Sequence, residues 1–302
     1  MSFNAKNFNM QGSLSQRLRW MFVMALVVVL AACSSIKLSY NHGDTLLYWW
    51  LDAYVDLDSG QKQWVEADID KLFKWHRETQ LQDYIQVLSN GQRQLKGNVT
   101  QADLLADYDD IKRRSLTVLM RAAPDLADLA RSLKPDQIAQ LEKKFASNND
   151  DYRKKFLTGS TEKRQAYRYK KSMEQFELWF GSFSSEQESV IRKASDARPL
   201  DNQIWLEERM RRQNSVLKLV QKVQRDKLGK EATLAQVQAL IKETVDPQAN
   251  SEHKAFLDAT TTATAQLVLT VINIATPAQK AHADQRMQGW INDFKTLAAD
   301  KK

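Results

Sequence analysis

The sequence has very little of the residues that punctuate or cross-link a fold: among 302 residues there are one cysteine, five prolines and nine glycines. A single cysteine excludes internal disulfides and the cysteine clusters of zinc sites. The four histidines share no short spacing, so we expect no metal site and no cofactor. The shortage of turn residues, together with the lack of sustained apolar–polar alternation, excludes an all-β fold.

Apolar side chains instead recur three and four residues apart along almost the whole sequence, which predicts helices. We expect an all-α fold, a multi-helix bundle of about ten helices. A candidate seam at 195–200 separates N- and C-terminal halves, which should pack together because the linker is short. Asn90-Gly91 should end a long helix that begins at Asp58. Pro124 should open a new short helix, because proline favours helix starts.

The one cysteine directly follows a short apolar run. Residues 1–32 contain three basic residues and no acid, and Leu30-Ala31-Ala32 precedes Cys33. A positive start, a short apolar centre and small residues before a cut are typical of a signal peptide. The apolar centre, Trp20 to Leu30, is too short to cross a bilayer, which takes about 20 residues. We therefore predict a cleaved signal peptide over 1–32; a buried core helix or an uncleaved anchor is the alternative.

The motif Leu30-Ala31-Ala32-Cys33 resembles the lipobox of Gram-negative lipoproteins. That resemblance implies cleavage before Cys33, a diacylglyceryl thioether on its sulfur and acylation of the new terminus. Ser34, in place of an aspartate, implies sorting to the outer membrane, facing the periplasm. Residues 33–43 would then form a short lipidated tether to a helical domain over 44–302, with membrane lipid as the partner of acylated Cys33.

Residues 45–55 are rich in aromatic side chains: Tyr48, Trp49, Trp50 and Tyr54. One interpretation is a first helix inserted into the core. The other is a docking face, or a helix in the lipid interface beside the anchor, because tryptophan and tyrosine favour that zone.

Between Tyr152 and Lys171 the chain carries eight basic residues and one acid. The basic residues are Arg153, Lys154, Lys155, Lys163, Arg164, Arg168, Lys170 and Lys171. Interleaved tyrosines would suggest nucleic-acid binding in a cytosolic protein, but with an export signal we expect no nucleic-acid partner. We predict an anion-binding patch for lipid headgroups, lipopolysaccharide phosphates or wall carboxylates. A solvated helix face, balanced by acids elsewhere, is the alternative.

A short motif recurs where helices should begin: an apolar residue, usually a capping residue, two variable positions and a glutamine. Its copies are 57–61, 133–137, 183–187, 232–236 and 275–279, with 99–103 a near miss. Such a spacing predicts capping boxes, in which the glutamine side chain turns back to the N-cap amide. The pattern also resembles the Leu-Thr-x-x-Gln signature of small periplasmic helical chaperones, which implies binding of unfolded clients.

The stretch from Tyr40 to Asp52, with Trp75-His76-Arg77 and Tyr84 downstream, resembles an uncharacterised family of Gram-negative lipoproteins with a domain of unknown function. It implies a helical envelope lipoprotein and brings no known activity. Because no catalytic constellation is evident, we expect a non-enzymatic binding or chaperone-like protein, with envelope proteins, lipopolysaccharide or the cell wall as partners. A wall-directed enzyme with an unrecognised carboxylate site and a scaffold subunit of an envelope complex are the alternatives.

Overall fold

The computed structural model describes residues 36–300, so the predicted signal peptide and Cys33 lie outside the described residues. Within that range all regular structure is helical and no strand is present, which confirms the all-α prediction. The elements are α2 (Gly43–Val55), α3 (Ser59–Thr79), α4 (Leu81–Lys96), α5 (Gln101–Ser132), α6 (Pro135–Tyr152), the π-helix η1 (Arg153–Leu157), α7 (Thr161–Phe180), α8 (Ser185–Asp196), α9 (Asn202–Asp226), α10 (Lys230–Val245), α11 (Lys254–Ile274) and α12 (Pro277–Ala299).

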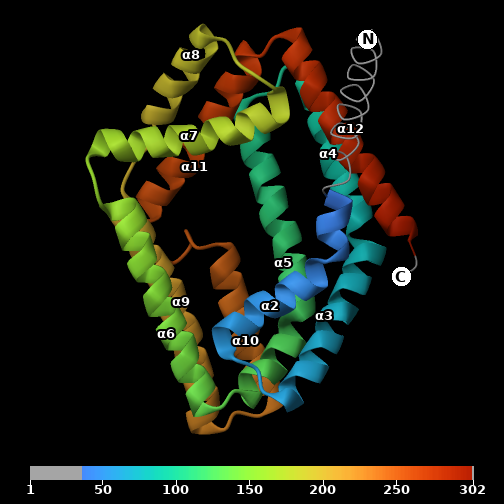
Figure 1. Cartoon of the computed structure of the whole chain (residues 1–302), viewed down its shortest axis with the longest axis vertical. Helices are drawn as coiled ribbons and strands as arrows, with labels where there is room; N and C mark the ends of the chain where they lie inside the picture. The colour runs from blue at the N-terminus through green and yellow to red at the C-terminus, as the bar shows by residue number, and fades with distance from the viewer. Residues whose placement is uncertain (1–35, 301–302) are drawn as a thin grey trace, which may run out of the picture.

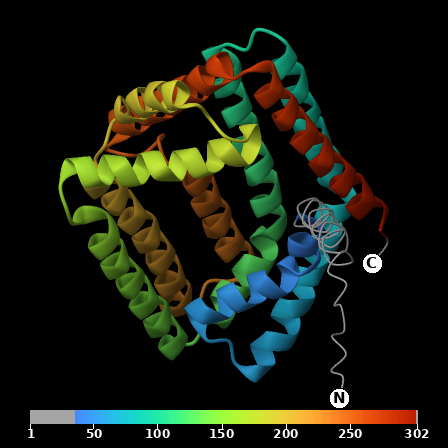
Figure 2. The ribbon, with the colours of Figure 1, turned by 45° about the horizontal axis from the view of Figure 1, so that its top comes forward.

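The long helix α5 joins the two ends of the molecule (Figure 1). At one end α5 is accompanied by α2, α3, α6, α9 and α10, and at the other by α4, α7, α8, α11 and α12. Helix α12 packs along α4, and α10 packs along α5. Figure 2 shows α6 and α9 side by side, with α7 crossing beyond their ends. This arrangement places α7 and the start of α9 at the junction between the two groups of helices.

Each end has its own core cluster. The first cluster contains Leu57, Leu133 and Val220, and the second contains Ile191 and Leu267. Both clusters therefore combine residues from before and after 195–200, a stretch that contains the end of α8 and most of the turn to α9. Length and composition alone would let α11 cross a membrane, but a core helix passes the same test, and Leu267 is buried in the second cluster.

The recurring motif begins α3, α6, α8 and α12, and its glutamines meet in two pairs, Gln61 with Gln137 and Gln187 with Gln279. Each Oε1 accepts a hydrogen bond from the N-cap amide of its own helix, at 2.8–3.0 Å. Each Nε2 donates to the Oε1 of the paired glutamine, at 2.6–3.1 Å. The same Nε2 also donates to the carbonyl two residues before the partner's N-cap. Four partners satisfy each amide, as burial requires.

The fifth copy of the motif does not start a helix. Helix α10 has Gly229 as its N-cap, so Thr233 lies inside the first turn and is buried. Its hydroxyl donates to the Gly229 carbonyl at 2.9 Å, and Gln236 is exposed. The prediction of a cap at Thr233 is therefore wrong, because the glycine four residues earlier in the loop offers an extended N-cap conformation.

Two predicted helix boundaries are also wrong. Pro124 lies inside α5, which continues to Ser132. Burial of Ala123 and Ala127 against α10 outweighs the hydrogen bond that the proline removes. The pair Asn90-Gly91 lies inside α4, and the break falls at Gln80. A Cβ on Gly91 would come within 3.3 Å of the Met287 sulfur, so the glycine permits close packing of α12 rather than a turn.

The described part of the predicted tether is helical and docked rather than extended. Residues 36–41 form a helical turn before α2. The Tyr40 hydroxyl is 2.8 Å from His76 Nδ1, and Arg77 donates to the Asn41 amide oxygen at 3.2 Å. A Cβ on Gly43 would lie 2.7 Å from the Phe73 ring. Residues 36–43 of the predicted tether therefore belong to the folded body of the protein.

Candidate anion-binding site

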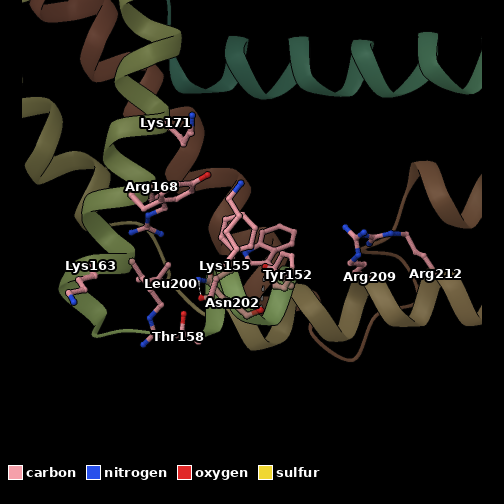
Figure 3. Close-up of a pocket in the computed structure, with 14 residues that line it drawn as sticks. Tyr152, Lys155, Thr158, Lys163, Arg168, Lys171, Leu200, Asn202, Arg209 and Arg212 are labelled. Atoms are coloured by element: carbon pink, nitrogen blue, oxygen red, sulfur yellow. Dashed lines mark hydrogen bonds between the residues drawn. The ribbon is translucent and has the colours of Figure 1, made fainter. Parts of the chain in front are cut away.

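The basic segment begins where α6 changes into a π-helical turn. Such turns are rare and occur often at functional sites. Phe156 of η1 packs between two tyrosines, with ring centroids 4.7 Å from Tyr152 and 5.6 Å from Tyr167. Asn202, at the start of α9, donates to the Phe156 carbonyl at 2.7 Å (Figure 3). Gly159, with φ of 85°, then reverses the chain into α7.

These elements enclose a cavity of about 600 Å³, hereafter the basic cavity. Seven cationic side chains line it: Lys155, Lys163, Arg164, Arg168, Lys171, Arg209 and Arg212. No carboxylate, histidine or cysteine of residues 36–300 is among the lining residues. Figure 3 shows that the cations come from η1, α7 and α9 and lie around the aromatic rings. The arrangement concentrates positive charge in a concave site.

Five of the eight predicted basic residues line this cavity. Arg153, Lys154 and Lys170 do not, and Arg153 instead pairs with Asp150 at 2.8 Å. Arg209 and Arg212 complete the lining from α9 and were not predicted. Their spacing of three residues on one helix face was the available signal, but nothing local connects that face to the basic segment.

The cavity's positive charges are largely without counter-charges. Among the described residues, only Lys171 of the seven has a carboxylate within 4 Å, Glu174 at 2.6 Å. The Nε atoms of Arg164 and Arg168 are buried without a hydrogen-bond partner. Lys155 lies 5.2 Å from the centroid of the Phe156 ring, so its compensation comes from a ring face rather than an acid.

Burial adds to this imbalance. It lowers the pKa of Arg168 and Arg212. Asp196 near Arg168 and Glu208 near Arg212 oppose this lowering, although neither acid lines the cavity. Arg198 lies outside the cavity lining, and burial, reinforced by the nearby charge of Arg168, lowers its pKa to about 10. Burial of positive groups has an electrostatic cost, which a bound anion would relieve.

Arg168 also has a structural role. Its guanidinium donates to the backbone carbonyls of Ser195 at 3.0 Å, Arg198 at 3.1 Å and Pro199 at 2.7 Å. These carbonyls lie at the C-terminal end of α8 and just beyond it, where a positive charge also interacts favourably with the helix dipole. Arg168 therefore fixes the α8–α9 turn against α7.

The predicted aromatic residues of α2 divide between two environments. Tyr48 and Tyr54 pack against the first core cluster. Trp49 and Trp50 are 62% and 57% exposed, and the Trp50 ring packs at a tilt against Tyr54, with 4.8 Å between centroids. Exposed Leu46 lies on the same helix. The helix thus contributes to the core and also presents an apolar outer face.

Two further polar clusters have structural explanations. His76 lies between the hydroxyls of Tyr40 and Tyr84, at 2.8 and 3.0 Å. Glu208 of α9 is buried, where it accepts hydrogen bonds from Ser251 and Arg211. Within residues 36–300 no group of three or more histidine, cysteine, aspartate or glutamate side chains could hold a metal ion.

Comparison with protein families gives one match, over residues 53–243, to DUF6279, a family of unknown function. The matched range covers more than half of the chain. The chain belongs to the DUF6279 family. This match confirms the part of the prediction that placed the chain in a family of unknown function. Every residue that lines the basic cavity falls inside the DUF6279 range, whereas Trp49 and Trp50 precede it. No significant match was found among curated proteins or among solved structures.

Proposed function

We propose that the protein is a lipid-anchored, periplasm-facing helical binding protein of the outer membrane, which holds an anionic ligand in the basic cavity without reacting with it. The observation that carries this proposal is the cavity lining, seven cations with no acid among them. The lipobox before Cys33 supports the envelope location.

The chemistry of the lining favours a phosphate group over a wall carboxylate. Four of the seven cations are arginines. A guanidinium can donate two parallel hydrogen bonds to phosphate oxygens and loses less hydration than an ammonium does. A doubly charged phosphate compensates several cations at once, which a single carboxylate cannot.

Binding fits the lining better than catalysis does. Histidine and carboxylate are the common general bases in enzymes, and cysteine or a hydroxyl beside such a base is the common nucleophile. The lining contains no histidine, carboxylate or cysteine, and its remaining groups of this kind are lysines and hydroxyls. Tyr152 donates to the Asn202 carbonyl at 3.4 Å, and burial raises the pKa of its phenol, so this hydroxyl is poorly suited to accept a proton near neutral pH.

Calorimetric titration of the full acylated protein with pyrophosphate tests the proposal. The wild-type protein should bind, and affinity should fall as salt is raised. Replacing two lining arginines, in the variant Arg164→Gln/Arg212→Gln, should weaken binding at least about tenfold, since charge-assisted hydrogen bonds are lost. Lys170→Gln is the matched control, because Lys170 belongs to the same basic segment but does not line the cavity. Equal binding by all three proteins, or no binding by any, would remove the proposal.

A second candidate function, docking to an envelope partner, is supported by the exposed face of α2. Leu46, Trp49 and Trp50 leave a large apolar surface in solvent beside the predicted anchor. Trp49→Glu should abolish capture of a crosslinked partner while the protein stays folded. A chaperone-like role has less support, because the motif glutamines of α3, α6, α8 and α12 are all engaged in capping and pairing.

A further inference from the structure

A second cavity of about 530 Å³ adjoins the basic cavity. Four residues line both: Arg168, Leu200, Asn202 and Trp205. The second cavity extends from this shared edge between α5 and α11. We refer to it as the apolar cavity, because its walls differ in kind from those of the first.

The apolar cavity gathers exposed hydrophobic side chains. Tyr108 and Ile111 of α5 are 38% and 55% exposed, and Trp205 of α9 is 37% exposed. Leu104 and Val268 line the same cavity from α5 and α11. Apolar groups left in water at one concave place mark a ligand or interaction site more often than scattered ones do.

The polar groups of this cavity are mostly satisfied within the protein. The hydroxyls of Thr260 and Thr261 donate to carbonyls of their own helix, at 2.8 and 3.0 Å. Arg198 donates to the hydroxyls of Ser172 and Ser195, at 3.1 and 3.0 Å. Asp107 is the one carboxylate in the lining. The lining of this cavity therefore favours an apolar ligand group over a hydrogen-bonding one.

We propose that the two cavities form one site for an anionic amphiphile, a phosphate-bearing acyl lipid whose headgroup lies in the basic cavity and whose acyl chain lies in the apolar cavity. This inference rests on the proposed function and narrows its ligand. An acyl chain that extends along Trp205 from a phosphate in the basic cavity enters the apolar cavity directly, because Trp205 lines both cavities. Covering Tyr108 and Ile111 with hydrocarbon removes apolar surface from water. Each volume falls within the range of about 300–1,000 Å³ that small-molecule sites occupy.

Three probes separate the two parts of the ligand: glycerol 3-phosphate is the headgroup alone, didecanoylglycerol the chains alone, and didecanoyl phosphatidic acid both. Native mass spectrometry of the full acylated protein, titrated with each probe in the same nonionic detergent, gives the relative affinities. Phosphatidic acid should bind at least about tenfold more tightly than either fragment, since burial of about two methylene groups suffices for that factor.

Paired variants assign the probes to the two cavities. Tyr108→Gln/Ile111→Gln should weaken phosphatidic acid binding at least about tenfold by removing apolar contacts, yet leave glycerol 3-phosphate binding unchanged. Arg164→Gln/Arg212→Gln should weaken both. Leu178→Gln/Val190→Gln, at two other exposed apolar positions, is the control and should bind all probes as the wild type does. Circular dichroism verifies that each variant is folded; Ile111→Gln alone, at the more exposed position, replaces the double variant if that one unfolds.

The outcomes distinguish the inference from the function on which it rests. Equal affinity for glycerol 3-phosphate and phosphatidic acid, insensitive to Tyr108→Gln/Ile111→Gln, would overturn the amphiphile and leave a phosphate-binding protein. Equal affinity for didecanoylglycerol and phosphatidic acid would overturn the role of the headgroup. Binding of none of the probes, together with no binding of pyrophosphate, would overturn both proposals.

Discussion

Gln61 and Gln137 donate hydrogen bonds to each other, Gln61 Nε2 to Gln137 Oε1 at 3.1 Å and Gln137 Nε2 to Gln61 Oε1 at 2.6 Å. The two residues are 76 positions apart, and each also caps its own helix. Gln187 and Gln279 repeat the arrangement across 92 positions in the other core cluster. Each end of the molecule is thus held by a reciprocal pair of helix N-termini.

Gln137→Leu should lower the free energy of unfolding by about 2–4 kcal/mol, because it removes all the hydrogen bonds of one buried amide at once. The Lys134 amide and the Asp56 carbonyl lose their side-chain partner, and Gln61 loses its bonds to Gln137 while it keeps those to Asp58 and Ser132. Urea unfolding followed by circular dichroism measures the loss. Gln236→Leu, at the exposed glutamine of the copy that does not cap, should stay within about 0.5 kcal/mol of the wild type. Similar losses in both variants would contradict a stabilising role for the pair.

Double-mutant cycles should distinguish pairing from capping. Gln187→Ala and Gln279→Ala should be coupled by about 1–2 kcal/mol, because each removes the other's partner. Gln61→Ala and Gln187→Ala act in different core clusters and should add within about 0.5 kcal/mol. The same urea titrations supply all values. Additivity within the 187–279 pair would mean that each glutamine stabilises only its own helix.

The motif also shows what a single sequence can and cannot predict here. A capping box joins residues three positions apart, so local spacing predicts it. The pairing of Gln61 with Gln137 depends on the fold, and no local sequence pattern predicts it. The basic cavity is likewise predictable only in its local part. Five of its cations lie in the predicted basic segment, whereas α9 contributes Arg209 and Arg212 some forty residues later in the sequence.

Where local rules failed, tertiary packing was the reason. Pro124 is tolerated inside α5 because the neighbouring alanines are buried against α10. Glu208 has the local sequence of a solvated position, yet Ser251 and Arg211 satisfy it in the interior. Helical periodicity predicts neither contact, because it identifies the apolar face of a helix but not the residues that pack against that helix.

His76 should make the stability of the protein depend on pH. Burial lowers the pKa of His76 below the ordinary value of 6.5. Near pH 6 this histidine is therefore protonated to a greater extent in the unfolded chain than in the folded protein. The free energy of unfolding should therefore fall as pH drops through 6.5, by at most about 1.4 kcal/mol per pH unit for one proton. Urea unfolding at pH 7.5, 6.5 and 5.5 measures the slope.

The contribution of His76 is the difference between variants. His76→Gln should have a shallower slope than the wild type over that range, although it is less stable at pH 7.5 because the Tyr40 and Tyr84 hydroxyls lose a partner. His282→Gln, at an exposed histidine, should keep the wild-type slope. Identical slopes in all three proteins would show that another group causes the pH dependence.

The basic cavity should cost stability while it is empty. Lys163→Gln/Arg164→Gln removes two of its uncompensated charges and should raise the free energy of unfolding by about 0.5–1 kcal/mol at low salt. Salt screens such repulsion, so the gain should shrink at high ionic strength. Thermal unfolding in 20 mM and 500 mM NaCl tests this. Lys170→Gln/Lys193→Gln removes the same charge outside the cavity and should have a smaller effect; a larger effect would place the repulsion elsewhere.

Arg168→Lys should destabilise the protein although it preserves the charge. The guanidinium reaches three carbonyls of the α8–α9 turn, and an ammonium on a flexible chain cannot reproduce that planar fork. We expect a loss of about 1.5–3 kcal/mol in the free energy of unfolding, the value of hydrogen bonds to a charged group. Lys171→Arg, three positions along the same cavity wall, should be nearly neutral. If Arg168→Lys were as stable as the wild type, a positive charge alone would suffice at this position, and the guanidinium would not be what fixes the turn.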